Sequence, residues 1–369
     1  MKLYLRIILL FLMIINFQIL FSQDTLLSDL ISSETNIIKI KSLIEQGIDV
    51  NSKNRFQMSP LEVASKSGNM EIIKLLISHG ARINEKMAND RTALMYALSD
   101  GNNYELVEYL LQNGAEVNVK DKSGVPAIFY LYLSDQPIFG TRVNFIKLLE
   151  NYGANLKITN IDSSTILYKM VSSCDLPSAR YLISEKEFDI SSTNFQQKTI
   201  YDKIAKCNLD MLQYLLSLKP VNLNFKNIFF NAAVANNFQI ISYLIDTLKV
   251  IKINEQDKFN RNALMFAYDN TNDETINYLL KKGIDINAKD TFGVNVFMRA
   301  CYICNMNLMK KLVNQKVKIN AEDNDKWTAI DYAEASYMMN KTEAISYLQS
   351  IHVKNGKDKK SKPIFKKQE

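Results

Sequence analysis

The stretch from Tyr104 to Asn118 reads YELVEYLLQNGAEVN. Leu106, Val107 and Leu110 recur at the three- and four-residue spacing of one helical face. Gly114 follows four residues after Leu110, where a helix commonly ends in a left-handed turn that glycine adopts without a Cβ clash. The stretch therefore predicts an amphipathic helix that stops at a glycine and passes into an extended segment.

The leucine of this stretch recurs along the chain at intervals of 29 to 39 residues, most of them between 33 and 36. Such self-similarity is typical of a stacked array, in which each copy of a small unit buries the face of its neighbour. The first such leucine is Leu43 and the last is Leu348. Between them, the positions that we expect to hold the array together are Leu76, Leu110, Leu149, Leu182, Leu215, Leu244, Leu279 and Leu312.

Two further features keep register with these leucines. An apolar residue followed by Asn comes after most of the leucine helices, as at Val117 and Asn118. The next helix, which is the first helix of the following unit, is then predicted to begin eight residues after the Asn, where Ser, Thr or Asn can cap its first turn. These openings lie at Ser59, Thr92, Pro126, Asn262, Asn295 and Thr328.

The unit so defined resembles the ankyrin repeat. The resemblance rests on Ser59–Ala64 (SPLEVA), Thr92–Ala97 (TALMYA), Asn262–Ala267 (NALMFA) and Thr328–Ala333 (TAIDYA), with Gly80–Asn84 and Gly283–Asn287 after the leucine helix. It covers about Leu26 to His352. It implies an all-α fold, an ankyrin-repeat α-solenoid of about ten helix-turn-helix units joined by hairpin-like loops.

We place these units roughly at 24–51, 52–84, 85–118, 119–157, 158–191, 192–224, 225–254, 255–287, 288–320 and 321–353. The sequence also departs from the family's pattern. The histidine that usually follows the Leu of the first helix is missing everywhere, and Glu62 and Asp331 are among its replacements. The loop after Asn224 is cut to a few residues, and the segment 134–142 is lengthened. We expect the centre, 157–254, to be the least regular part.

The two ends of the chain are predicted to lie outside the array. Residues 1–22 have a cationic start, a short apolar run and a small residue before Gln23, which is typical of a cleaved secretory signal peptide. An uncleaved anchor is the alternative, although the apolar run is shorter than the ~20 residues that span a bilayer. We expect residues 354–369, which are rich in lysine, to form a disordered basic tail.

The net charge of +6 belongs to these ends. Lys2 and Arg6 leave with the signal, and 354–369 carry seven lysines against two acidic side chains. The array itself is therefore close to neutral. Such a body does not favour nucleic-acid binding, which needs clustered Lys and Arg.

No catalytic, metal-binding or cofactor-binding constellation can be assembled from the sequence. The only histidines are His79 and His352. We expect no enzymatic activity, no metal and no cofactor.

The four cysteines give no metal motif either. Cys174 and Cys207 occupy equivalent stations of neighbouring units. We expect them not to pair, because stacked helices lie roughly 8–10 Å apart whereas disulfide Cα atoms lie within about 7 Å. For Cys301 and Cys304 the sequence favours buried free thiols, with a strained disulfide as the alternative.

The loop tips are the predicted contact points for a partner. The resemblance implies protein binding through a concave face built from loops and first helices. Aromatic residues stand at or beside one loop station, where they either anchor an interface or fold back onto the next loop; they are Phe56, Phe195, Phe259, Phe292 and Trp327. A further candidate is the apolar segment 137–139 in the lengthened unit.

These observations predict an exported, monomeric, non-enzymatic scaffold, periplasmic or extracellular and without stable membrane insertion once the signal is cleaved. It would bind a protein partner and no nucleic acid. Two other roles remain open. One is a periplasmic toxin-neutralising or enzyme-accessory protein, and the other is a secreted effector that binds host proteins. Fold resemblance does not choose among them.

Overall fold

The computed structural model describes residues 27–32, 37–54, 56–86, 88–101, 103–133, 142–191, 196, 198–220, 223–269 and 273–356. Within them it contains helices and no strand; two isolated bridges, Lys120–Pro126 and Thr159–Thr165, are the only β-type pairs. None of the described helices is both long and apolar enough to cross a membrane. The predicted signal peptide, the segment 137–139 and residues 357–369 lie outside the described part.

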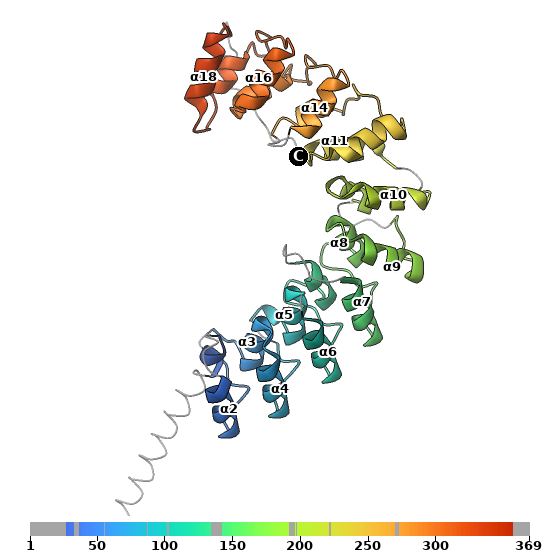
Figure 1. The fold of residues 1–369 in the computed structure, drawn as a ribbon, viewed down its shortest axis with the longest axis vertical. Coiled ribbons are helices and arrows are strands. Elements are labelled where there is room, and N and C mark those ends of the chain that lie inside the picture. The colour runs from blue at the N-terminus through green and yellow to red at the C-terminus, as the bar shows by residue number, and fades with distance from the viewer. Residues whose placement is uncertain are drawn as a thin grey trace, which may run out of the picture. The chain divides into compact units, whose positions relative to one another are not determined.

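The chain divides into two compact units, residues 1–199 and 200–369. In the first, Figure 1 shows helix pairs stacked side by side in chain order. The helices are α2 (Ile37–Glu45), α3 (Pro60–Ser67), α4 (Met70–Ser78), η1 (Ala88–Asp90), α5 (Ala93–Asp100), α6 (Tyr104–Gln112), η2 (Ala127–Tyr132), α7 (Arg142–Asn151), α8 (Ile166–Ser172) and α9 (Leu176–Lys186).

The second unit repeats the arrangement, again with consecutive pairs in contact (Figure 1). Its helices are η3 (Ile200–Asp202), η4 (Ile204–Lys206), α10 (Leu209–Ser217), α11 (Phe225–Val234), α12 (Phe238–Ser242), η5 (Tyr243–Thr247), α13 (Ala263–Phe266), α14 (Glu274–Lys281), α15 (Val296–Tyr302), α16 (Met306–Asn314), α17 (Ala329–Glu334) and α18 (Lys341–Ser350). The all-helical solenoid expected from the sequence is confirmed for the described residues.

The first helix of most pairs begins where the sequence predicts. Ser59, Thr92, Pro126, Asn262, Asn295 and Thr328 are the residues immediately before α3, α5, η2, α13, α15 and α17. Ser59 shows the reason, since its hydroxyl accepts a hydrogen bond from the Glu62 amide at 3.2 Å and so satisfies an exposed donor of the first turn.

The periodic leucines form the core of each unit. All eight from Leu76 to Leu312 have a relative exposure of 0%. Each lies on the second helix of its pair, and that helix packs against the first helix of the same pair or the second helix of an adjoining one. Burial of the whole side chain stabilises each site by about 1.5–3 kcal/mol relative to exposure.

Asparagine side chains connect successive repeats. Asn84 receives a hydrogen bond from the Glu116 amide at 2.8 Å and donates to the Gly114 carbonyl at 2.9 Å. Both partners belong to the next repeat. Asn51 and Asn118 make the same pair of bonds one repeat earlier and one repeat later. The apolar–Asn pair of the sequence is therefore a link between repeats.

A second set of asparagines lies before the second helix of a pair. Asn103 accepts from the Leu106 amide at 2.9 Å, which caps α6, and donates to the Gly68 carbonyl of the preceding repeat at 3.3 Å. Asn237 and Asn305 act in the same way for α12 and α16. One side chain thus caps the start of a helix and links two repeats.

The irregular positions lie mainly near the middle of the chain. The first helix of the pair is a 3₁₀ turn at η2 and again at η3 and η4, and the second helix of one pair ends in the π-helical turn η5. Where glycine is missing after the second helix, Glu187, Lys219, Lys249 and Lys316 adopt left-handed backbone angles, with φ of 53–62°. The left-handed conformation costs a residue other than glycine roughly 1–2 kcal/mol.

In two repeats, the residue that replaces the family's histidine is a buried carboxylic acid. Asp331 in α17 accepts hydrogen bonds from the amide and hydroxyl of Thr328, both at 2.8 Å. Glu62 in α3 is 1% exposed, and one of its carboxylate oxygens has no hydrogen-bond partner in the described structure. Burial raises the pKa of Glu62 above its ordinary value, against smaller opposing effects that include a hydrogen bond with Tyr96.

We predict that Glu62→Gln stabilises the protein at pH 7 and that this gain disappears near pH 4. The raised pKa means that the folded chain holds this proton more tightly than the unfolded chain. The stability that Glu62 contributes is therefore full below its unfolded pKa of about 4.3 and falls as the pH rises through the folded pKa. Urea denaturation of both proteins at the two pH values measures the difference, and an equal shift at both would show that ionisation of Glu62 is not responsible.

Two cysteines differ from the sequence-based expectation. Cys174 and Cys207 are disulfide-bonded, so the prediction that they stay unpaired is wrong. That prediction applied the separation of helix axes to residues that lie outside helices. Cys174 lies in the turn after α8, with φ of 59°, and Cys207 is the extended residue directly after η4. Cys301 and Cys304 are buried free thiols.

Candidate functional site: the loop face of the repeats

The loops between repeats are shaped by one carboxylate or amide at a fixed position. In the loop that contains Phe292, Asp290 Oδ1 accepts hydrogen bonds from the amides of Phe292 at 2.9 Å and Val294 at 3.0 Å. Asn54, Asp121, Asn160, Asp257 and Asp323 bind the amides two and four residues further on in the same way. These hydrogen bonds hold the backbone of the loop tip, which lies two residues after the Asp or Asn, in one conformation.

Neighbouring loops of the second unit also bind one another. The Thr291 amide donates to the Phe259 carbonyl, and the Asn324 amide donates to the Phe292 carbonyl, both at 3.0 Å. Gly293 lies at φ +81°, and a Cβ there would come within 2.8 Å of the Asn324 backbone nitrogen. Three consecutive loops therefore form one continuous surface.

The predicted tip aromatics differ in their exposure. Phe56 is 60% exposed and Phe292 is 53% exposed, so both rings are accessible to a partner. Phe259 is half-buried, with Lys258 Nζ and the Arg261 guanidinium carbon each 5.0 Å from its ring centre.

Trp327 provides no exposed ring. Trp327 is half-buried and packs beside Tyr332, against the cluster of Val294, Met298 and Tyr332. Its ring therefore packs against the protein, which is the second of the two alternatives given for the loop-tip aromatics. Phe195 lies outside the described residues.

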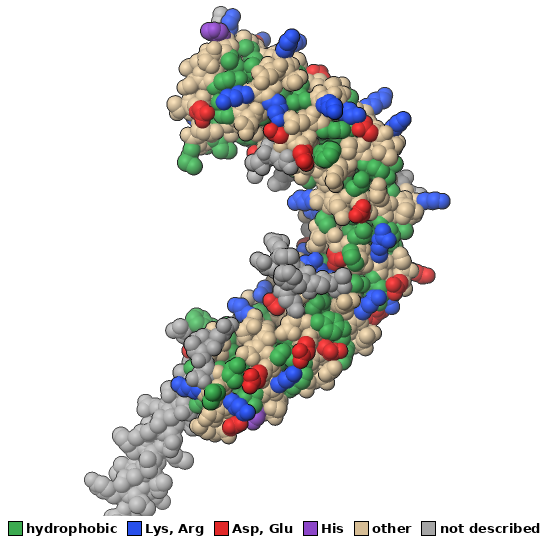
Figure 2. Space-filling view, in the orientation of Figure 1, with side chains coloured by type: hydrophobic (Ala, Val, Ile, Leu, Met, Phe, Trp, Pro, Cys, Tyr) green, Lys and Arg blue, Asp and Glu red, His purple; other side chains and the backbone are tan. Residues whose placement is uncertain are grey.

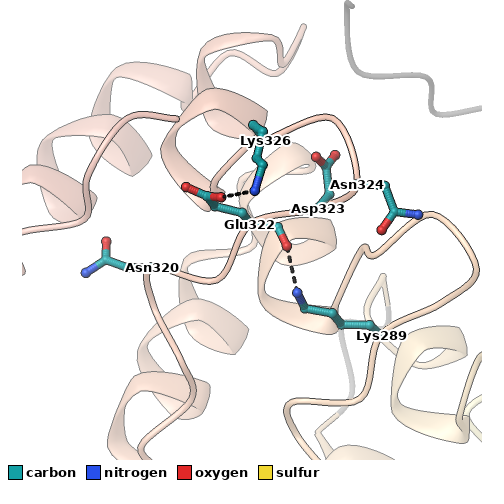
Figure 3. A pocket seen from close by; sticks show the side chains of 6 residues that line it. All are labelled: Lys289, Asn320, Glu322, Asp323, Asn324 and Lys326. Atoms are coloured by element: carbon teal, nitrogen blue, oxygen red, sulfur yellow. Dashed lines mark hydrogen bonds and ion pairs between the residues drawn. The ribbon is translucent and has the colours of Figure 1, made fainter. Parts of the chain in front are cut away.

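Two hollows lie along the loops of the second unit. The first encloses about 670 Å³ and is polar, and it is lined by Lys289, Asn320, Glu322, Asp323, Asn324 and Lys326. Figure 3 shows Lys289 pointing to the Glu322 carbonyl, 2.7 Å away, while Lys326 forms an ion pair with the Glu322 carboxylate at 3.2 Å. Because the lining also contains the carboxylates of Glu322 and Asp323, the charges of the two lysines are balanced within this hollow.

The second hollow, about 800 Å³, lies between α11 and the loop that contains Phe259. Phe230 and Phe266 line it together with polar and cationic side chains of the helix and the loop. Sequence reasoning did not identify it as a site. The sequence feature that could have indicated it is the shortened loop after Asn224. Because this loop is short, the loop that contains Phe259 lacks a neighbouring loop of the usual length.

Charged side chains of both signs are interspersed on the visible face of each unit, with no extended patch of one sign (Figure 2). Among the described residues, no three His, Cys, Asp or Glu side chains are grouped so that they could hold a metal ion. His79 ends α4, with Nδ1 2.9 Å from the Leu75 carbonyl oxygen, so its ring has a structural partner.

Comparison with known proteins agrees with this architecture. Residues 30–121 and 200–290 match the family described as "Ankyrin repeats (3 copies)". The chain is an ankyrin-repeat protein, and repeats of this kind generally act as protein-binding scaffolds. One curated relative is "Putative ankyrin repeat protein FPV244" of fowlpox virus (strain NVSL), which is 32% identical over 69 residues, 19% of this chain. The match spans about 10% of the length of that relative.

Proposed function

We propose that the chain is a non-enzymatic scaffold that binds a partner protein through the loop face of its repeats, with Phe292 as a principal anchor. The observation that carries this proposal is an exposed aromatic ring on a fixed backbone. Phe292 is 53% exposed, yet its amide is held by Asp290 and its carbonyl by Asn324. A ring presented on a rigid loop loses little conformational entropy on binding, and such residues tend to dominate interface energetics.

The test is affinity capture of partners from a native extract, with the double variant Phe259→Ala and Phe292→Ala compared with the wild-type chain. We expect partner recovery to fall at least about tenfold, the equivalent of 1.4 kcal/mol. Val234→Ala is the matched control, since Val234 has the same 53% exposure but lies on α11. Equal recovery with the double variant and this control would remove the loop tips from the proposal.

We also propose that the protein is exported and acts in the periplasm or outside the cell. Two observations support this location. Residues 1–22 have the order of a secretory signal, and Cys174 and Cys207 are disulfide-bonded, a state that persists in oxidising compartments. The roles of toxin-neutralising or enzyme-accessory protein and of secreted effector are both compatible with this location, and the identity of the captured partner distinguishes them.

Thiol counting on protein purified from its native source tests the proposed location. After denaturation without reductant, we expect alkylation at Cys301 and Cys304 only, and alkylation at all four cysteines after reduction. In the folded protein even Cys301 should react slowly, because burial raises the pKa of its thiol. N-terminal sequencing should begin at Gln23. Four reactive thiols before reduction, together with an intact Met1, would contradict export.

A further inference from the structure

The shortened repeat leaves one side of the loop that contains Phe259 uncovered. In this repeat, α11 begins directly after Asn224, whose side chain accepts from the Asn227 amide at 3.0 Å and caps the helix. In the following repeats the loops bind one another through backbone hydrogen bonds. Among the described residues, no loop of the preceding repeat forms such a bond with the loop that contains Phe259. The hollow of about 800 Å³ occupies this place.

The apolar part of the hollow consists of aromatic rings and one guanidinium group. The rings of Phe230 and Phe266 lie 5.1 Å apart, tilted by 33°. The guanidinium carbon of Arg261 lies 4.5 Å from the centre of the Phe266 ring, and Asp257 holds the guanidinium through an ion pair at 2.7 Å. This arrangement favours an aromatic guest, because ring edges and faces and a stacked guanidinium all attract a further ring.

The rim of the hollow is polar and carries an unpaired positive charge. Lys226 forms an ion pair with Glu255, and Arg261 is neutralised by Asp257. Lys258 is exposed, and no carboxylate of the described residues forms an ion pair with it. Carboxamide side chains also stand on the rim, and such groups can both donate and accept hydrogen bonds, as an extended peptide backbone requires. Asn227 already donates to Asp202 and accepts from Asn231. The other carboxamides are Asn224, Asn231 and Gln256.

We infer that this hollow binds an extended segment of the partner protein in which an aromatic residue stands next to an acidic one. The aromatic side chain would lie against Phe230, Phe266 and Arg261, the carboxylate would meet Lys258, and the carboxamides would bind the peptide backbone. The inference rests on the proposed function and names the chemistry of the partner. The chain's own apolar pair Ile364–Phe365 has the wrong charge for this position, since lysines flank it.

A random peptide library displayed on phage, selected on the full chain, tests the inference. We expect enrichment of sequences that place an aromatic residue next to Asp or Glu. Recovery of these sequences should fall at least about tenfold on Lys258→Glu, which repels the acidic residue, and on Asn231→Trp, which fills the hollow. Lys252→Glu is the matched control, because it makes the same change of charge at an exposed residue that does not line the hollow.

Enrichment of basic aromatic peptides, equal recovery on Lys258→Glu and Lys252→Glu, or no enrichment over a blank surface would each overturn the inference. The proposed function would stand in each of these cases, provided that the double variant Phe259→Ala and Phe292→Ala lowers capture of the native partner as expected. If capture by that double variant is unchanged while the peptides behave as expected, the loop-tip proposal fails and the hollow remains a binding site.

Discussion

Replacing Asp290 by Ala should lower the free energy of unfolding of the second unit by about 3–5 kcal/mol. Asp290 is 6% exposed, and its two oxygens have separate roles. Oδ1 binds the Phe292 and Val294 amides, whereas Oδ2 pairs with Arg299, whose side chain is only 13% exposed. The substitution therefore removes the carboxylate that pairs with a largely buried cation and leaves two amides without their acceptor. Removing one member of a buried ion pair costs far more than the pair itself contributes.

Urea denaturation followed by far-ultraviolet circular dichroism measures this loss. Asp290→Asn separates the two roles, because its carbonyl oxygen can still accept from the two amides while its NH2 group replaces the oxygen that accepts from Arg299. We expect Asn to restore only the part of the loss that comes from the two amides, and to remain less stable than the wild type. If Ala and wild-type unfold at the same urea concentration, the Asx side chain does not organise the loop.

Replacing Leu279 by Ala should cost about 2.7–5 kcal/mol, the range found for buried leucines that leave a cavity. Leu279 is fully buried on α14, which packs against α12 and α13. In a linear array each layer is stabilised by its neighbours, so a cavity in one layer weakens the contacts on both sides of it.

Hydrogen exchange in the native state locates the effect. We expect faster exchange in α12, α13 and α14, and unchanged exchange in α3 to α6 of the first unit. Leu280→Ala is the matched control, because Leu280 is the next residue on α14 and is only partly buried. Uniform acceleration along the whole chain would contradict stabilisation by nearest neighbours.

The sequence predicted those features that local chemistry decides. Leu110 and its equivalents fix the buried face, and capping residues such as Ser59 mark where helices open. These signals repeat at every layer, so each copy supports the others. Even where glycine is missing, as at Lys316, the left-handed turn is retained, because stacking compensates for its cost.

Features that depend on a neighbouring repeat were harder to predict. Asn103 and Asn305 stand seven residues before a periodic leucine, a visible regularity, but their bonds to the preceding repeat follow only from the stacked geometry. Phe292 and Trp327 look equivalent in the sequence, yet one ring is exposed and the other packs beside Tyr332. The cut loop after Asn224 was also visible in the sequence. Of the two rings that line the hollow beside it, Phe266 lies far along the chain, in the next repeat.

Site-specific photo-crosslinking in living cells shows directly whether the loop face binds a protein. A benzophenone amino acid is placed at Phe292, on an exposed loop tip, and in a second strain at Lys281, on the exposed side of α14. We expect a discrete crosslinked product from position 292 and none from position 281. A product from position 281 alone, or none from either position, would contradict binding through the loop face.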